Sequence, residues 1–210
     1  MYWRLRVFAV LVAVTLTVGD AAAEQRGRFH QSVSDYEARR RLMNKDYEGA
    51  IREANQALKE HPGDPLALTN RGFAYLELGD YKHAVEDHDA VLLVAPDNPG
   101  ALGNACFSRA VANIELDRAK TYCDAAVGRR ADLATLDSRG FLNLRRADYA
   151  AALADYDAAL SYSRVASPLY GRGIAKIRLG RIDEGKADLA AALKRQPDVA
   201  GNYSRRGIEP

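Results

Sequence analysis

The pattern Asp-Tyr-x-x-Ala occurs three times in this chain at a fixed period. The copies begin at Asp46, Asp80 and Asp148, which lie 34 and 68 residues apart. A recurrence of this length is typical of stacked repeats, in which each unit buries its apolar face only against its neighbours. A chain of 210 residues is long enough for one domain or an elongated array of repeats, and the period favours the array.

The clearest unit spans residues 65–98 and reads as a helical hairpin. Apolar residues follow helical spacing on both sides of a turn at Gly79-Asp80, and Pro96 ends the second stripe. The small residues Gly72 and Ala84 lie near the middle of the two stripes. They would let the two helices approach each other closely.

These residues resemble the tetratricopeptide repeat, a 34-residue pair of antiparallel helices. The match includes a small residue at Gly72, an aromatic residue at Tyr75, the turn before Tyr81, a second small residue at Ala84 and the late Pro96. The resemblance implies an all-α fold, in which helix hairpins form a right-handed superhelical stack, or α-solenoid.

The resemblance extends over most of the chain and predicts about five repeats. A truncated first helix follows them, because the residues around Tyr203 repeat the motif around Gly173, and it would cap the stack at residues 200–210. The predicted repeats are 31–64, 65–98, 99–132, 133–165 and 166–199.

The N-terminus has the order of a secretory signal peptide. Arg4 and Arg6 precede an uncharged apolar run over residues 7–18, and Ala21-Ala22-Ala23 offers a cleavage site. We expect residues 1–23 to be the signal peptide and 24–30 a polar lead-in. Export is therefore expected, and the family resemblance favours a bacterial periplasm as the destination. No stable membrane span is expected after cleavage. The alternative is a membrane tether through an uncleaved N-terminus.

The chain's two cysteines fall in the two helices of the third predicted hairpin. Cys106 and Cys123 are equidistant from a midpoint between Ile114 and Glu115, where the turn should be. In an antiparallel hairpin such residues lie at the same height, and in an exported protein such a pair tends to form a disulfide. The alternative is a pair of small, reduced core residues.

Three arginines, Arg71, Arg139 and Arg172, each precede the small glycine of a first helix. One hypothesis is that they pair with acidic residues of the second helices and fix how the hairpins stack. The alternative is a basic column that binds carboxylates, such as a peptide C-terminus.

An apolar column follows the same period. Phe73, Phe107 and Phe141 are 34 residues apart and Ile174 continues the series. In the family this position tends toward the concave groove, so the column is either the floor of a peptide groove or packing between adjacent first helices. Three further apolar residues would widen the strip, and three charged residues at its edge suggest an amphipathic ligand. The apolar residues are Leu76, Leu144 and Ile177, and the charged residues are Glu77, Arg145 and Arg178.

Catalysis, cofactors and nucleic acid are not expected. The net charge is only +2 and the basic residues form no block, which argues against nucleic-acid binding. His83 and His88 are five residues apart and do not share a helix face, so no metal pair is predicted. The sequence also lacks the common nucleophile, phosphate-loop and zinc-protease motifs.

The sequence therefore predicts a non-catalytic scaffold that binds a protein or peptide of unknown identity in its concave groove. The alternative is a structural subunit that self-associates or docks into an envelope complex.

Overall fold

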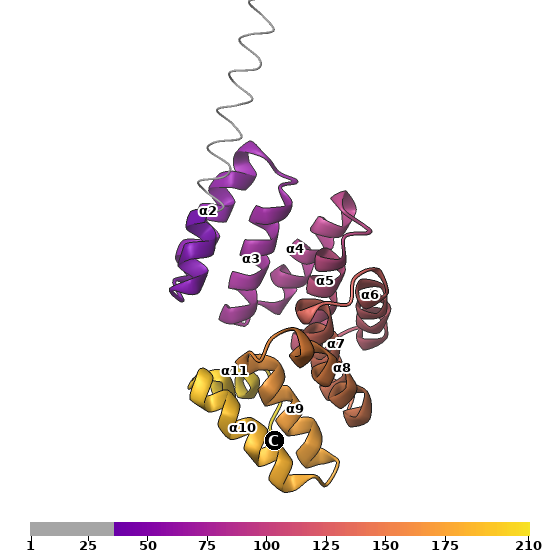
Figure 1. The fold of residues 1–210 in the computed structure, drawn as a ribbon. Coiled ribbons are helices and arrows are strands. Elements are labelled where there is room, and N and C mark those ends of the chain that lie inside the picture. Colours follow the sequence, from indigo (N-terminus) through magenta and orange to yellow (C-terminus); the bar gives the residue numbers. More distant parts are fainter. Residues whose placement is uncertain (1–35) are drawn as a thin grey trace, which may run out of the picture.

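A computed structural model of the chain describes residues 36–210, which form helices joined by short turns and contain no strand (Figure 1). The predicted signal peptide (1–23) and polar lead-in (24–30) lie outside the described residues. A helix over residues 36–43 precedes α2 (Tyr47–Glu60). Four hairpins and a short helix follow: α3 (Pro65–Leu78) with α4 (Tyr81–Val94), α5 (Pro99–Ala112) with α6 (Leu116–Arg129), α7 (Leu133–Arg145) with α8 (Tyr149–Tyr162), α9 (Ala166–Arg178) with α10 (Ile182–Arg195), and α11 (Val199–Arg205).

The recurring Asp-Tyr-x-x-Ala pattern marks the start of a second helix. Its aspartate is the N-cap, whose carboxylate accepts a hydrogen bond from a backbone N–H of the first turn. Its alanine faces the paired helix and has no exposed surface. The capping residues are Asp46, Asp80 and Asp148, and the buried alanines are Ala50, Ala84 and Ala152.

A small residue sits where the two helices of a hairpin cross. A Cβ atom added to Gly72, Gly140 or Gly173 would lie 2.7–2.8 Å from the side chain of the second helix. That side chain is His88, Tyr156 and Leu189 respectively. The absence of a Cβ therefore permits the close approach. In the third hairpin Cys106 and Cys123 occupy this crossing.

The helices stack in sequence, as the all-α repeat prediction required. From α2 onward each helix contacts the next along the chain, and the first helices α3, α5, α7 and α9 also contact one another in order. The path curves, so that α9–α11 (orange to yellow) come round toward the lower end of α3 (Figure 1). A continuous core runs from Leu76 in α3 to Ile208 beyond α11.

The C-terminal half-repeat packs against α9 and α10, as a cap would. The chain then turns at Gly207, which has a φ of +68°, and continues across the first helices. This second part was not expected from the sequence. None of the helices described between residues 36 and 210 is long and apolar enough to cross a membrane.

Candidate functional site

The apolar column predicted from the sequence lies on the first helices, and its central part is covered by the chain's own C-terminal segment. Phe107 and Phe141 meet edge to face, with ring centroids 5.2 Å apart. Tyr203 of α11 packs against Phe141 at 5.7 Å and against Tyr170 at 5.0 Å. We call residues 199–210 the C-terminal segment and the surface of α3, α5, α7 and α9 beneath it the inner face.

Tyr203 is, with Val199, one of the two most buried residues of the C-terminal segment. Its side chain is 2% exposed and its hydroxyl donates a hydrogen bond to the carbonyl oxygen of Ser167 at 3.0 Å. A second hydroxyl, that of Tyr156, lies 3.4 Å away. Burial raises the pKa of Tyr203 above its usual value, so the phenol remains a donor at neutral pH.

Arg206 lies over the ring of Phe107, with 5.4 Å between the guanidinium carbon and the ring centroid. Its guanidinium also forms an ion pair and hydrogen bond with Glu77 of α3, whose side chain is 23% exposed. The cation is therefore held by a ring face and a carboxylate together. Glu77 was predicted at the edge of the groove.

The other two predicted edge residues hold the backbone of the C-terminal segment. Arg145 donates to the carbonyl oxygens of Arg206 and Gly207, the latter at 3.3 Å, and to that of Ala110 in α5 at 2.9 Å. Arg178 donates to the carbonyl oxygen of Glu209 at 3.2 Å. Backbone carbonyls are present in any peptide, so these two contacts carry no side-chain preference.

The remaining residues of the predicted groove lie in three different places. Leu144 and Ile174 line a pocket whose other wall is Gly207, Ile208 and Glu209. Leu76 is 5% exposed and belongs to the core. Ile177 is directed toward α10, because its side chain lies 2.6 Å from where a Cβ would stand on Gly185.

Phe73 lies at the open end of the inner face. It lines a cleft with residues of the first hairpin and of the C-terminal segment, and Lys45 forms an ion pair with Asp198 across this cleft at 2.6 Å. Met43, 78% exposed, contributes to the cleft. The other lining residues are Leu42, Tyr47, Glu77, Gln196 and Asn202.

The three arginines beside the small glycines pair internally. Each makes a two-pronged contact with an aspartate of its own second helix, and its remaining nitrogen reaches the preceding second helix. The inner pairs are Arg71–Asp87, Arg139–Asp155 and Arg172–Asp188, at 2.7 Å each. The outer acceptors are Asn55, Asp124 and Asp157.

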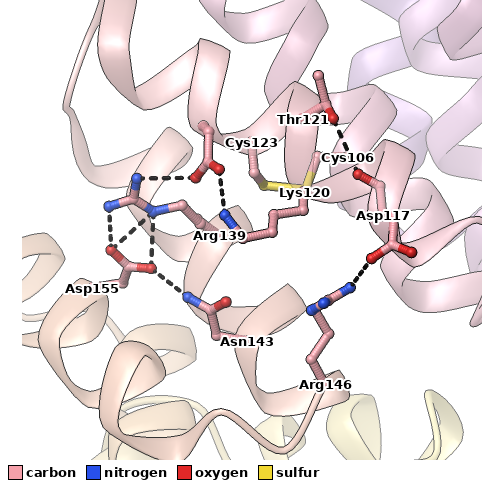
Figure 2. Close-up of polar contacts among 10 residues, drawn as sticks. Cys106, Asp117, Lys120, Thr121, Cys123, Arg139, Asn143, Arg146 and Asp155 are labelled. Atoms are coloured by element: carbon pink, nitrogen blue, oxygen red, sulfur yellow. Dashed lines mark hydrogen bonds and ion pairs between the residues drawn. A yellow bond between two sulfur atoms is a disulfide. The ribbon is translucent and has the colours of Figure 1, made fainter.

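Figure 2 shows the Arg139 arrangement, in which Asn143 also donates to Asp155 at 2.8 Å. At the equivalent position near the C-terminus, burial alone would raise the pKa of Asp188. Hydrogen bonds from Arg172 and Lys176 outweigh burial, so the pKa of Asp188 is lowered. These arginines are engaged within the stack and are not arranged as a free basic column.

A disulfide joins Cys106 and Cys123, with their Cα atoms 5.4 Å apart (Figure 2). Of the two states expected from the sequence, the structure has the oxidised one. The third hairpin also lacks the arginine of its neighbours, since Ala105 occupies that position. Arg109, one turn later and 1% exposed, pairs instead with Asp89 of α4 and with Glu115.

Two groups of residues escaped the sequence reasoning. Arg109 is displaced by a helical turn from the repeating arginine, so the period did not point to it. The contacts of the C-terminal segment were missed because Tyr203 matches the repeat and suggested only a cap. The contacts of the C-terminal segment with Glu77, Arg145 and Arg178 depend on how far the stack curves, which a single repeat does not show.

Comparisons with known proteins agree with this architecture. The tetratricopeptide repeat family matches residues 41–106. No curated protein sequence matches the chain. The structure resembles a thermophilic TPR protein of Thermus thermophilus (20% identity, TM-score 0.72, covering 84% of this chain and 98% of that one).

Two further solved structures share the fold. One is PilW, described as a widely conserved type IV pilus biogenesis factor (16% identity, TM-score 0.68, covering 84% of this chain and 85% of that one). The other comes from the APC/C hetero-tetramer Cut9–Hcn1 (14% identity, TM-score 0.71, covering 87% of this chain and 37% of that one). Residues 41–106 match the tetratricopeptide repeat family, and the described residues beyond them repeat the same helix hairpin, so the structure has the tetratricopeptide-repeat fold.

Proposed function

We propose that this chain is a non-catalytic scaffold that binds a protein or peptide along its inner face, in the envelope of a bacterium. The observation that carries the proposal is the C-terminal segment itself. Side chains from three first helices, Glu77, Arg145 and Arg178, hold a stretch of polypeptide against an aromatic floor. A surface that holds one peptide in this way has the chemistry to hold another.

The cleft around Phe73 provides the entry for a partner. Its wall combines exposed apolar side chains, such as Met43, with the carboxylate of Glu77 and the cation of Lys45. Because the wall is built on helices, little ordering is needed when a partner binds. An amphipathic segment fits this mixture best.

The comparisons support a protein partner without naming one. One similar structure is a pilus biogenesis factor and another is part of a hetero-tetramer, and both share only the fold with this chain. The envelope assignment rests on the signal-like order of residues 1–23 and on the family resemblance.

Photo-crosslinking in the native host tests the proposal. A benzophenone amino acid at Met43 samples the cleft, and the same group at Lys120 on the outer helix α6 is the matched control, since both side chains are exposed. We expect a discrete adduct from position 43 in the envelope fraction and none from position 120. Equal adducts from both positions, or none from position 43, would contradict inner-face binding.

A second candidate, assembly through self-association, is favoured by one apolar patch. Leu66 and Leu93 are 61% and 86% exposed and lie with Val94 at the end of the second hairpin away from its turn. Sedimentation at rising protein concentration tests it. A concentration-dependent dimer that Leu93→Lys abolishes supports assembly, and a monomer throughout removes this candidate.

A further inference from the structure

The C-terminal segment contacts the inner face through three separate side-chain positions. Tyr203 fills an aromatic site, Arg206 lies between a ring and a carboxylate, and Ile208, 7% exposed, closes the pocket at Leu144 and Ile174. These positions follow one another at spacings of three and two residues. The contacts therefore define a short recognition pattern rather than general apolar burial.

We propose that the C-terminal segment is a displaceable internal ligand that occupies the partner site, and that the partner carries the same pattern. That pattern is an aromatic residue, an arginine or lysine three positions later and an aliphatic residue two positions after that. The proposal rests on the inner-face function proposed above and specifies its ligand. A partner segment binds by replacing residues 203–208.

The aromatic position is selective for a phenol. The hydroxyl of Tyr203 meets the carbonyl oxygen of Ser167 and lies 3.5 Å from the Ser167 hydroxyl, which itself donates to Asp137 at 3.0 Å. A phenylalanine here would leave the partly buried Ser167 carbonyl without this donor. Tyrosine is therefore favoured in the partner at this point.

The second position selects a cation. Glu77 is the acidic group that faces Arg206, and Phe107 offers its ring face on the other side. Arg205 also approaches Glu77, at 3.7 Å, so two successive cations share this carboxylate. A partner with an acidic residue at this position would be repelled.

Several features make the segment displaceable. The helix α11 has only seven residues and no side-chain cap, and a helix of this length has little stability without tertiary contacts. The carboxylate of Asp198, at its start, is engaged by Lys45 across the cleft instead. The segment can open locally while the disulfide-bonded centre of the stack remains folded.

Internal occupancy predicts a specific effect on affinity. A ligand that binds only the open form has its affinity reduced by the fraction of molecules that are open. Weakening the segment must therefore strengthen binding of an external peptide of the same sequence. If the segment has a purely structural role, weakening it gives no gain in affinity, because its site would not bind the external peptide.

The experiment uses the full chain and a fluorescent peptide with the sequence of residues 199–210, measured by anisotropy. We expect the double variant Tyr203→Ala, Arg206→Ala to bind the peptide about 10-fold or more tightly than the unaltered chain. Adding Glu77→Ala to the double variant should lower that affinity about 10-fold. A control peptide in which the tyrosine and both arginines are replaced by serine should not bind.

Equal peptide affinity for the unaltered chain and the double variant would overturn the proposal. If the double variant does not fold, hydrogen exchange on the unaltered chain tests whether the C-terminal segment opens locally. Amides of residues 203–208 that exchange faster than those of α7 and α9 support local opening, and exchange only through global unfolding overturns it. A dimer with exchanged segments would instead make a second copy the occupant, which also overturns the proposed partner.

The two proposals can fail separately. If the double variant binds the peptide but position 43 gives no crosslink, the proposed cellular function is contradicted and the proposed displaceable segment is supported. If position 43 gives a crosslink but the unaltered chain and the double variant bind the peptide equally, the proposed function is supported. The C-terminal segment is then a fixed part of the fold.

Discussion

The arginines beside the small glycines are polar contacts that hold one hairpin to the next. Each joins both helices of its own hairpin to the preceding second helix, as Arg139 does between α7, α8 and α6 (Figure 2). The aspartate is the more buried partner: the side chain of Asp155 is 7% exposed and that of Arg139 27%. Loss of the arginine would leave a buried carboxylate.

Arg139→Met should lower the free energy of unfolding by about 3 kcal/mol, because Asp155 loses its charged partner in a poorly hydrated site. Urea denaturation followed by circular dichroism measures the loss. The matched control is Arg181→Met, whose partner Glu184 is exposed, and it should leave stability essentially unchanged.

A second variant separates pairing from packing. Adding Asp155→Leu to Arg139→Met removes the stranded carboxylate and should restore part of the lost stability. An Arg139→Met protein as stable as the parent would refute the internal-pairing role.

His88 gives the second hairpin a dependence on pH. It lies at the helix crossing beside Gly72 with no exposed surface, and burial lowers its pKa from 6.5 to about 4. Below pH 6.5 the unfolded chain gains a proton on this ring that the native state resists. Stability should therefore fall as the pH drops from 6.5 toward 4, by up to about 3 kcal/mol.

The matched variant is His88→Leu, since Leu189 occupies the equivalent crossing in the last hairpin. Urea midpoints at several pH values should show a shallower decline between pH 6.5 and 4 for the variant than for the parent. Parallel curves would show that another group controls acid stability.

At the scale of the helical element, glycine decides how closely neighbouring hairpins pack. Tyr156 of α8 lies between Gly140 of α7 and Gly171 of α9, and a Cβ on Gly171 would stand 2.3 Å from the tyrosine ring. The ring is fully buried and cannot move aside into solvent. Both first helices thus need a glycine at the point where they meet this ring.

Gly171→Ala should lower the free energy of unfolding by about 1–3 kcal/mol, because the added methyl overpacks the site. Gly128→Ala is the control within a helix, since a Cβ there meets no atom within 4 Å. It should leave stability unchanged or raise it by up to about 1 kcal/mol through better helix propensity. Equal effects of the two changes would contradict the packing role.

The third hairpin replaces the glycine crossing by a covalent one. Its second helix, α6, begins at Leu116, and the preceding Glu115 has a φ of +45° and makes no side-chain cap hydrogen bond. The cap that an aspartate provides to α2, α4 and α8 is therefore missing there. The Cys106–Cys123 bond compensates by closing a loop of sequence separation 17. On the chain-entropy model a loop of this size contributes about 3 kcal/mol.

Reduction of the native chain should therefore lower stability by about 3 kcal/mol. A variant with Cys106→Gly and Cys123→Leu copies the crossing of Gly173 and Leu189 and should recover part of that loss. Calorimetry with and without reductant tests both statements. An unaltered melting temperature on full reduction would show that the bond does not stabilise the fold.

At the scale of the whole molecule, the period predicted the hairpins because each boundary depends on local chemistry. Asp80 caps α4, and Gly79 ends α3 with a φ of +80°, and both signals lie within a few residues of the boundary. The candidate site was less accessible. Arg206 and Glu77 are separated by 129 residues, so their contact depends on the accumulated rotation of several hairpins. The repeat pattern in the sequence does not specify the rotation between successive hairpins, so it could not predict this contact.

The same contact changes how the molecule should unfold. In a linear array each hairpin touches only its neighbours, and its ends can unfold independently. Here the C-terminal segment joins α3, α5, α7 and α9 through Glu77, Phe107, Phe141 and Arg178. It therefore links the second hairpin to the last, and this should make unfolding more cooperative than a linear array allows.

Tyr203→Ala should break this link. We expect a loss of about 3 kcal/mol from the buried ring and, in urea, a broader transition in which the first hairpins unfold before the disulfide-bonded centre. Leu93→Ala is the control, because that side chain is 86% exposed on the outer helix α4 and its removal should shift neither midpoint nor slope. Paired fluorescent labels in α2 and α10 would report the two ends separately. Coincident transitions for both labels in Tyr203→Ala would mean that nearest-neighbour contacts alone make the stack cooperative.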